Sequence, residues 1–212
     1  METLPKWIDM IVIPLLGVLI SLIFSAIIIL LIGENPIDAL NLMITGALGS
    51  TYGWGYTLYY ATNFIFTGLA VSVAFHARMF NIGGEGQAAI GGPGVAVVCL
   101  SFGWNHWVPA LLAASLGAAV FGALWAAIPA YLQAKHGSHI VITTIMFNFI
   151  GASLLNYLLV NVMRPEGSMD PATAKFAEAT HLPTLHDMLD LVGISFSKAG
   201  PANVSFVIAL LA

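Results

Sequence analysis

Residues 10–32 read MIVIPLLGVLISLIFSAIIILLI, a run of 23 residues without a charged side chain. About 20 apolar residues in a helix span the hydrocarbon core of a bilayer. Outward from this run, three more uncharged stretches follow at 39–77, 86–134 and 136–163. Because a chain inside the bilayer must satisfy its backbone hydrogen bonds within helices or closed barrels, long uncharged runs of this kind predict an all-α polytopic membrane protein.

The composition also points to the membrane. Of the 212 residues, 59% are apolar and 8% are charged, whereas a soluble domain carries about 25% charged residues. A soluble fold is therefore excluded. The net charge of −4 leaves no basic face for a nucleic acid. Cys99 is the single cysteine, so we expect neither a disulfide within the chain nor a thiolate metal site.

The apolar runs predict five to six transmembrane helices within one transmembrane domain, residues 1–212. The expected spans are 10–32, 57–75, 88–102, 108–129 and 140–162, with a sixth that opens at Ala202. A helix from Pro36 to about Leu48 is too short to cross and is expected either at the interface or packed against the bundle. Because the sixth run stops at residue 212, we expect the chain to be the N-terminal part of a longer protein.

The span at 88–102 is short, and Gly91-Gly92-Pro93-Gly94 interrupts it. Either this segment is a broken or re-entrant helix, or the glycine-rich stretch before it lies inside the membrane. Both arrangements need protein or a cavity around the irregular backbone.

The span at 108–129 and the residue after it carry small side chains at every fourth position. They are Ala110, Ala114, Ala118, Gly122, Ala126 and Ala130. Small residues on one stripe of a membrane helix let two backbones approach closely. We therefore expect this stripe to pack against a neighbouring helix.

The polar segments set the expected orientation. Tyr131 to His139 forms a polar hairpin, and residues 163–201 form a solvated loop that holds eight of the sixteen charged side chains. With the N-terminus in the cytoplasm, Lys6, Arg78 and Lys135 are cytoplasmic and the 163–201 loop is extracytoplasmic. The positive-inside rule favours this orientation.

No motif indicates an enzyme. The four lysines lack the Gly-Lys-Ser/Thr context of a Walker A loop, so the chain cannot hold ATP by that route. HExxH and GxSxG motifs are absent, and the six histidines have no metal-binding spacing. We therefore expect no catalytic residue, no metal ligand and no cofactor.

The stretch Asn81-Ile82-Gly83-Gly84-Glu85-Gly86-Gln87 carries the most chemistry. Glu85 is the single acidic residue between Asp38 and Glu166. A charge near the bilayer centre costs about 2.5–3.5 kcal/mol, so it must pair, be protonated or face a cavity. Discontinuous helices with irregular backbone hold polar solutes near the midplane.

Two interpretations of this stretch remain open. In one it lines a translocation pathway, and in the other it is an interfacial turn whose Glu85 is solvated and paired with Arg78. The candidate pathway residues are Asn81, Gly83, Gly84, Glu85, Gln87 and Asn148. Asn63 and Asn156 are weaker candidates, because interhelical hydrogen bonds explain a polar group in an apolar span equally well.

The sequence also resembles a known family. Phe80 to Gln87, FNIGGEGQ, after Thr67-Gly68-Leu69-Ala70, is similar to the signature of nucleoside- and simple-sugar-type ABC transporter permeases. The ribose and branched-chain amino-acid permeases belong to the same superfamily. Lys135 to Asn148, KHGSHIVITTIMFN, is similar to the family's loop and following helix, although many members carry an acidic residue where Ile140 stands.

The resemblance implies a permease subunit of an ATP-binding cassette importer in the inner membrane of a bacterial cell. Its implied partners are a separate ATPase subunit, a second permease subunit and an extracytoplasmic substrate-binding protein, and its implied cargo is a nucleoside or a simple sugar. The ATPase contact is then expected in the polar hairpin, at Lys135, His136, Gly137, Ser138 and His139.

Two alternatives stand beside this interpretation. An ion-coupled secondary transporter would use Glu85 as its coupling group and would take up solute without an ATPase. A purely structural membrane subunit would tolerate substitution of Asn81 and Glu85.

Overall fold

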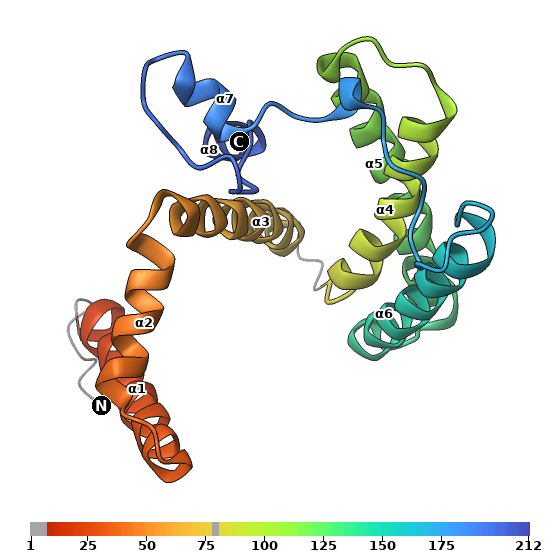
Figure 1. The fold of residues 1–212 in the computed structure, drawn as a ribbon. Coiled ribbons are helices and arrows are strands. Elements are labelled where there is room, and N and C mark those ends of the chain that lie inside the picture. The colour runs from red at the N-terminus through yellow and green to blue at the C-terminus, as the bar shows by residue number, and fades with distance from the viewer. Residues whose placement is uncertain (1–7, 78–80) are drawn as a thin grey trace.

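A computed structural model describes residues 8–77 and 81–212, and in those residues it contains helices and no strand. Lys6, Arg78 and Phe80, which the sequence arguments used, lie outside the described residues. The α-helices in chain order are α1 Ile13–Ile32, α2 Pro36–Leu48, α3 Thr51–His76, α4 Gly84–Ser101, α5 Trp107–His136, α6 Ile140–Tyr157, α7 Leu185–Asp190 and α8 Ser205–Leu211. Figure 1 shows α4, α5 and α6 as one group, with α1 and α2 on the far side of α3.

The predicted class is confirmed. Four apolar helical stretches are long enough to cross a membrane, at 8–32, 51–76, 107–136 and 140–162. This is fewer than the five to six expected. The other two expected spans correspond to α4, which has 18 residues, and to α8, which has seven.

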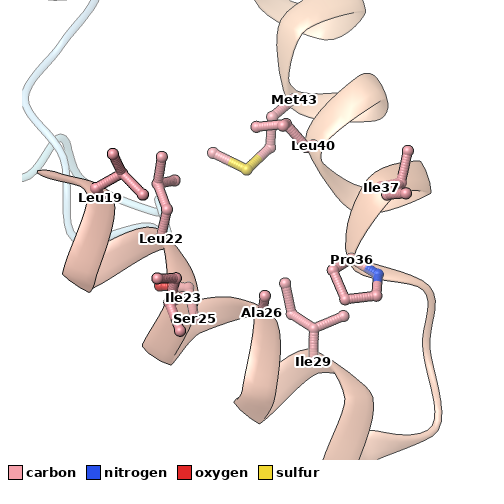
Figure 2. A pocket seen from close by; sticks show the side chains of 10 residues that line it. All are labelled: Leu19, Leu22, Ile23, Ser25, Ala26, Ile29, Pro36, Ile37, Leu40 and Met43. Carbon is pink, nitrogen blue, oxygen red and sulfur yellow. The ribbon is translucent and has the colours of Figure 1, made fainter.

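Helices α1 and α2 form an arm that contacts the rest of the described chain through α3. Gly33 ends α1 in the left-handed region at φ 95°, and the Asn35 side chain caps α2 by accepting from Ile37 N at 2.9 Å. A groove of about 380 Å³ lies between the two helices (Figure 2). Its lining is apolar apart from Ser25, so the groove offers little to a polar solute.

Helix α3 begins earlier than the sequence indicated. The expected span opened at Thr57, but the helix starts at Thr51 because Ser50 caps it, accepting from Gly53 N at 3.0 Å. Three aromatic residues, Tyr52, Trp54 and Tyr56, therefore lie within the first turns of the helix.

The break expected at Gly91-Gly92-Pro93-Gly94 is not found in α4. The helix runs without interruption from Gly84 to Ser101 and carries Pro93 in its interior. Gly91 and Gly94, on either side of Pro93, pack against α5: a Cβ on Gly94 would lie 2.5 Å from the carbonyl oxygen of Gly117. This packing holds the helix together where the local sequence disfavours it, and the irregular backbone is confined to the residues before Gly84.

The small-residue stripe of α5 packs on α4 as predicted over most of its length. Ala110 and Ala114 are buried, a Cβ on Gly91 would lie 3.4 Å from the carbonyl oxygen of Ala118, and one on Gly122 would lie 3.4 Å from that of Gln87. Ala130 is exposed, because it lies beyond the start of α4.

The polar hairpin is shorter than expected. Helix α5 continues through Tyr131 to His136 and ends at Gly137, which takes the left-handed conformation at φ 64°. Only residues 137–139 connect it to α6. Helix α6 continues as a π-helical turn, Leu158–Val162, so the predicted 140–162 span is confirmed.

The segment after α6 crosses from α5 to α3. Its 3-10 turn, Glu178–Thr180, contacts α5, and a Cβ on Gly55 of α3 would lie 2.8 Å from Gly200 Cα. Helix α7 carries a capping box, in which Thr184 Oγ1 accepts from Asp187 N at 3.2 Å and Asp187 Oδ2 accepts from Thr184 N at 3.2 Å. The Thr184 hydroxyl also donates to Asp187 Oδ2 at 2.7 Å. Hydrogen bonds from Thr184 hold the pKa of Asp187 below its ordinary value.

Candidate functional site at the start of α4

The candidate site is built around residues 81–87, which we call the entry segment. Gly83 occupies the N-cap position of α4 and has no side chain with which to cap the helix. Asn81 Oδ1 accepts from Gly83 N at 2.8 Å, and Asn81 Nδ2 donates to Gln87 Oε1 at 3.3 Å. The two amide side chains therefore brace the segment from within.

Asn148 of α6 supplies the missing cap from another helix. Its Oδ1 accepts from Gly86 N at 2.9 Å, and its Nδ2 donates to Ile82 O at 3.0 Å. An N-cap residue normally accepts from this third helical N–H group of its own helix. The cap of α4 thus comes from a residue that lies 62 positions after Gly86 in the chain.

Close packing accompanies these bonds. A Cβ on Gly86 would lie 3.0 Å from Asn148 Cα, and one on Gly151 would lie 3.2 Å from Gly86 Cα. Thr144 is 1% exposed, and its Cβ would be 3.3 Å from a Cβ on Gly83. Thr144, Asn148 and Gly151 follow each other at helical spacing, so one face of α6 holds the entry segment.

Glu85 lies apart from this network. Its side chain is exposed, as are Gly84, Ala88 and Gly92 on the same side of α4. Within 4 Å of a Cβ on Gly84 or Gly92 there is no neighbouring atom among the described residues. Of the six predicted pathway residues, the structure therefore joins Asn81, Gly83, Gln87 and Asn148 and leaves Gly84 and Glu85 on an open face.

The entry segment lies well along α6 rather than at its end. Asn148 comes eight residues after the start of α6 at Ile140, or about 12 Å at 1.5 Å per residue. The whole 140–162 stretch is long and apolar enough to span a membrane. The entry segment therefore contacts α6 within a stretch that is long and apolar enough to span a membrane.

Sequence reasoning missed two residues of the site, Thr144 and Trp125. Thr144 lies four residues before Asn148, and that spacing was a usable signal. Trp125 of α5 packs edge-on against Phe147 with ring centroids 5.5 Å apart. Among the described residues, its Nε1 is buried without a hydrogen-bond partner. Asn63 and Asn156, the weaker candidates, are both exposed.

The predicted ATPase-contact residues lie together at the far end of α5. Lys135 and His136 are exposed in its last turn, and Gly137 turns the chain toward α6. His139 is the N-cap residue of α6. Within the part of the chain that is described, Ser138 Oγ is buried and has no hydrogen-bond partner.

Residues 53–211, about three quarters of the chain, match the family described as branched-chain amino acid transport system / permease component. The chain belongs to this permease family. The match begins within α3 and reaches α8, so it covers the entry segment and the α5–α6 turn of the permease.

Three curated relatives agree with the family match. The chain is 35% identical over 87% of its length to the glucose ABC transporter permease protein TsgB13 of Haloferax volcanii. It is 32% identical over 98% to the guanosine ABC transporter permease protein NupP of Bacillus subtilis. It is 34% identical over 77% to the nucleoside ABC transporter permease protein NupB of Lactococcus lactis. These names are those of transporter components and not of enzymes.

The chain spans about half the length of these relatives: the aligned part covers 48%, 57% and 45% of them in the order given. No solved structure matches this permease.

Proposed function

We propose that this chain forms part of the membrane pathway of an ATP-binding cassette importer, as a permease subunit that works with a separate ATPase. The observation that carries the proposal is the family match over residues 53–211, together with relatives named as ABC transporter permeases. The absence of a Walker A loop in the sequence supports the assignment of ATP hydrolysis to another subunit.

The cargo we propose is a nucleoside, with a simple sugar as the second candidate. Two of the relatives are named for guanosine and for nucleosides, and one for glucose. These solutes share a ring that bears hydroxyl groups. The further partners are a second permease subunit and an extracytoplasmic binding protein, and the membrane is the bacterial inner membrane with the N-terminus in the cytoplasm.

The pathway in this proposal runs past the open face of the entry segment. Glu85 is the one carboxylate between Asp38 and Glu166, and it is exposed on a side of α4 where Gly84, Ala88 and Gly92 leave space. Asn81, Gly83, Gln87 and Asn148 shape the segment that presents it. A charge at membrane depth needs a polar surrounding, which a solute pathway supplies.

The α5–α6 turn is the proposed contact with the ATPase. Lys135, His136 and His139 are exposed there, and Gly137 and Ser138 complete the turn. Since α5 is 30 residues long, or about 45 Å, the turn lies at the end of a helix that exceeds the roughly 30 Å hydrocarbon core.

The proposal is tested by uptake of radiolabelled guanosine and glucose in vesicles that contain the full-length permease and its partner subunits. The control replaces the Walker A lysine of the ATPase subunit, which leaves the permease unchanged. We expect uptake to be lost with the inactive ATPase. Uptake that persists without ATP hydrolysis and stops when a protonophore is added would instead establish the ion-coupled alternative.

A further inference from the structure

The first turn of α4 is held by α6 rather than by its own cap. Gly83 at the N-cap contributes no side chain, and Asn148 provides both an acceptor for Gly86 N at 2.9 Å and a donor to Ile82 O at 3.0 Å. These two bonds join the backbone on both sides of Gly83 to one side chain. Rotation of the entry segment away from α6 would break both at once.

The packing beneath Asn148 leaves no room for sliding. Gly86 and Gly151 approach so closely that a Cβ on either would lie 3.0–3.2 Å from backbone atoms of the other helix. Thr144, one turn before Asn148, is buried against Gly83. The entry segment therefore touches α6 over two successive turns.

Helix α6 begins at Ile140, directly after the α5–α6 turn. A displacement of that turn reaches Asn148 along about 12 Å of continuous helix, without an intervening loop. By contrast, α4 is joined to α3 through residues 77–83, which include non-helical backbone at 81 and 82. Among the described residues, the hydrogen bonds that reach the entry segment from another helix come from Asn148 of α6.

We propose that Asn148 is a positioning residue that makes the entry segment move as one body with α6, so that the α5–α6 turn displaces Glu85 directly. The inference rests on the proposed function, in which that turn meets the ATPase. Asparagine is suited to the role because its amide accepts one hydrogen bond and donates another, whereas aspartate only accepts and alanine does neither.

The first test measures solute transported per ATP hydrolysed by the full-length transporter in proteoliposomes. Asn148→Ala should lower this ratio by about tenfold while ATP hydrolysis continues. Asn148→Asp, which keeps the acceptor for Gly86 N, should fall between Asn148→Ala and the wild type. Asn161→Ala is the matched control, an exposed asparagine in the π-helical turn that continues α6, and should stay within about twofold of the wild type.

A merely structural role for Asn148 would lower the amount of assembled transporter and its ATP hydrolysis together, and would leave the ratio unchanged. That result overturns the proposal. If wild-type uptake does not need the ATPase, the proposed function fails; if uptake is ATP-driven and Asn148→Ala keeps the wild-type ratio, only the positioning role fails.

A second test needs no transport activity. Gly83→Cys and Thr144→Cys in a Cys99→Ala background place two Cβ atoms about 3.3 Å apart, close to the usual disulfide separation of about 3.8 Å. The rate of disulfide formation is measured without nucleotide and with the ATPase trapped by a non-hydrolysable ATP analogue. One rigid body gives the same rate in both states. A rate that changes by about fivefold or more, or a disulfide that never forms, overturns the proposal.

Discussion

At the scale of single residues, the entry segment separates two kinds of polar side chain that look alike in sequence. Asn81, Gln87 and Asn148 have partners within the segment and α6, whereas the Glu85 carboxylate is exposed on the opposite side of α4. A side chain whose hydrogen-bonding groups are used by the backbone is poorly placed to bind a solute. Among the described residues, the Glu85 carboxylate and the Gln87 Nε2 amide have no hydrogen-bond partner, and of these the Glu85 carboxylate is the exposed, charged group that we expect to face the pathway.

Replacement of Glu85 tests its pathway role. Glu85→Ala should reduce uptake by about 10²-fold or more while the amount of protein in the membrane is unchanged, because removal of the charge only makes insertion easier. Initial uptake rates and quantitative immunoblots of membranes measure the two effects. Glu85→Gln keeps the shape without the charge, and separates a requirement for charge from one for hydrogen bonding. Normal uptake by Glu85→Ala would restore the solvated-turn interpretation.

Most residues of this site could be predicted from sequence, with the exception of Thr144 and Trp125, but their bonds could not. The lone acidic residue and the glycines mark the entry segment, because charges and flexible backbone are rare in apolar runs. The pairing of Gly86 with Asn148 joins residues 62 positions apart, and no local pattern records it. The separation of Glu85 from Asn81 depends on which face of α4 meets α6, which is set by packing.

At the scale of helices, tertiary packing overrides local signals in α4. The sequence GGPG predicts a break, since proline lacks the N–H group for one helical hydrogen bond and glycine disfavours the helix. In the fold, Gly91 and Gly94 are the residues that let α5 approach. The same glycines that weaken the isolated helix thus permit the contact that stabilises it, and this could not be foreseen without knowledge of the partner.

The glycines of α4 should consequently differ in their tolerance of a methyl group. Gly86→Ala places a Cβ 3.0 Å from Asn148 Cα and the Phe147 carbonyl oxygen, and overpacking of this kind costs about 1–3 kcal/mol. Gly92→Ala meets no atom within 4 Å among the described residues, and alanine favours a helix over glycine by about 1 kcal/mol. Thermal unfolding in detergent should show a lower midpoint temperature for Gly86→Ala than for the wild type. The midpoint of Gly92→Ala should not be lowered. Equal loss in both variants would contradict the α4–α6 packing.

The α5–α6 turn depends on one backbone conformation. Gly137 has φ 64°, a region that costs a residue with a Cβ about 1–2 kcal/mol and that asparagine tolerates better than most. Gly137→Pro is incompatible with it, because proline fixes φ near −65°. We expect Gly137→Asn to keep the most uptake, Gly137→Ala less and Gly137→Pro the least, while ATP hydrolysis persists in all three variants. Transport that survives Gly137→Pro would place the ATPase contact elsewhere.

At the scale of the whole molecule, the alternating directions of the helices separate two sets of loops. The segment after α6 contacts α5 through its 3-10 turn, at the end where α4 finishes and α5 begins (Figure 1). Lys175 belongs to this segment, and Lys135 lies in the last turn of α5. With α5 about 45 Å long and the hydrocarbon core about 30 Å thick, we expect the two lysines on opposite sides of the membrane.

The basic residues predict which side is cytoplasmic. Lys135 lies at a short connection, where the positive-inside rule is strongest. Lys175 belongs to a longer loop, and the translocation of long loops during insertion depends little on their charge. Lys135→Cys and Lys175→Cys, each in a Cys99→Ala background, report the sidedness through an impermeant thiol reagent. In right-side-out vesicles Lys175→Cys should react, and Lys135→Cys should react only after permeabilisation. The reverse pattern would invert the orientation but keep the fold, and reaction of both from one side would contradict the direction of α5 across the bilayer.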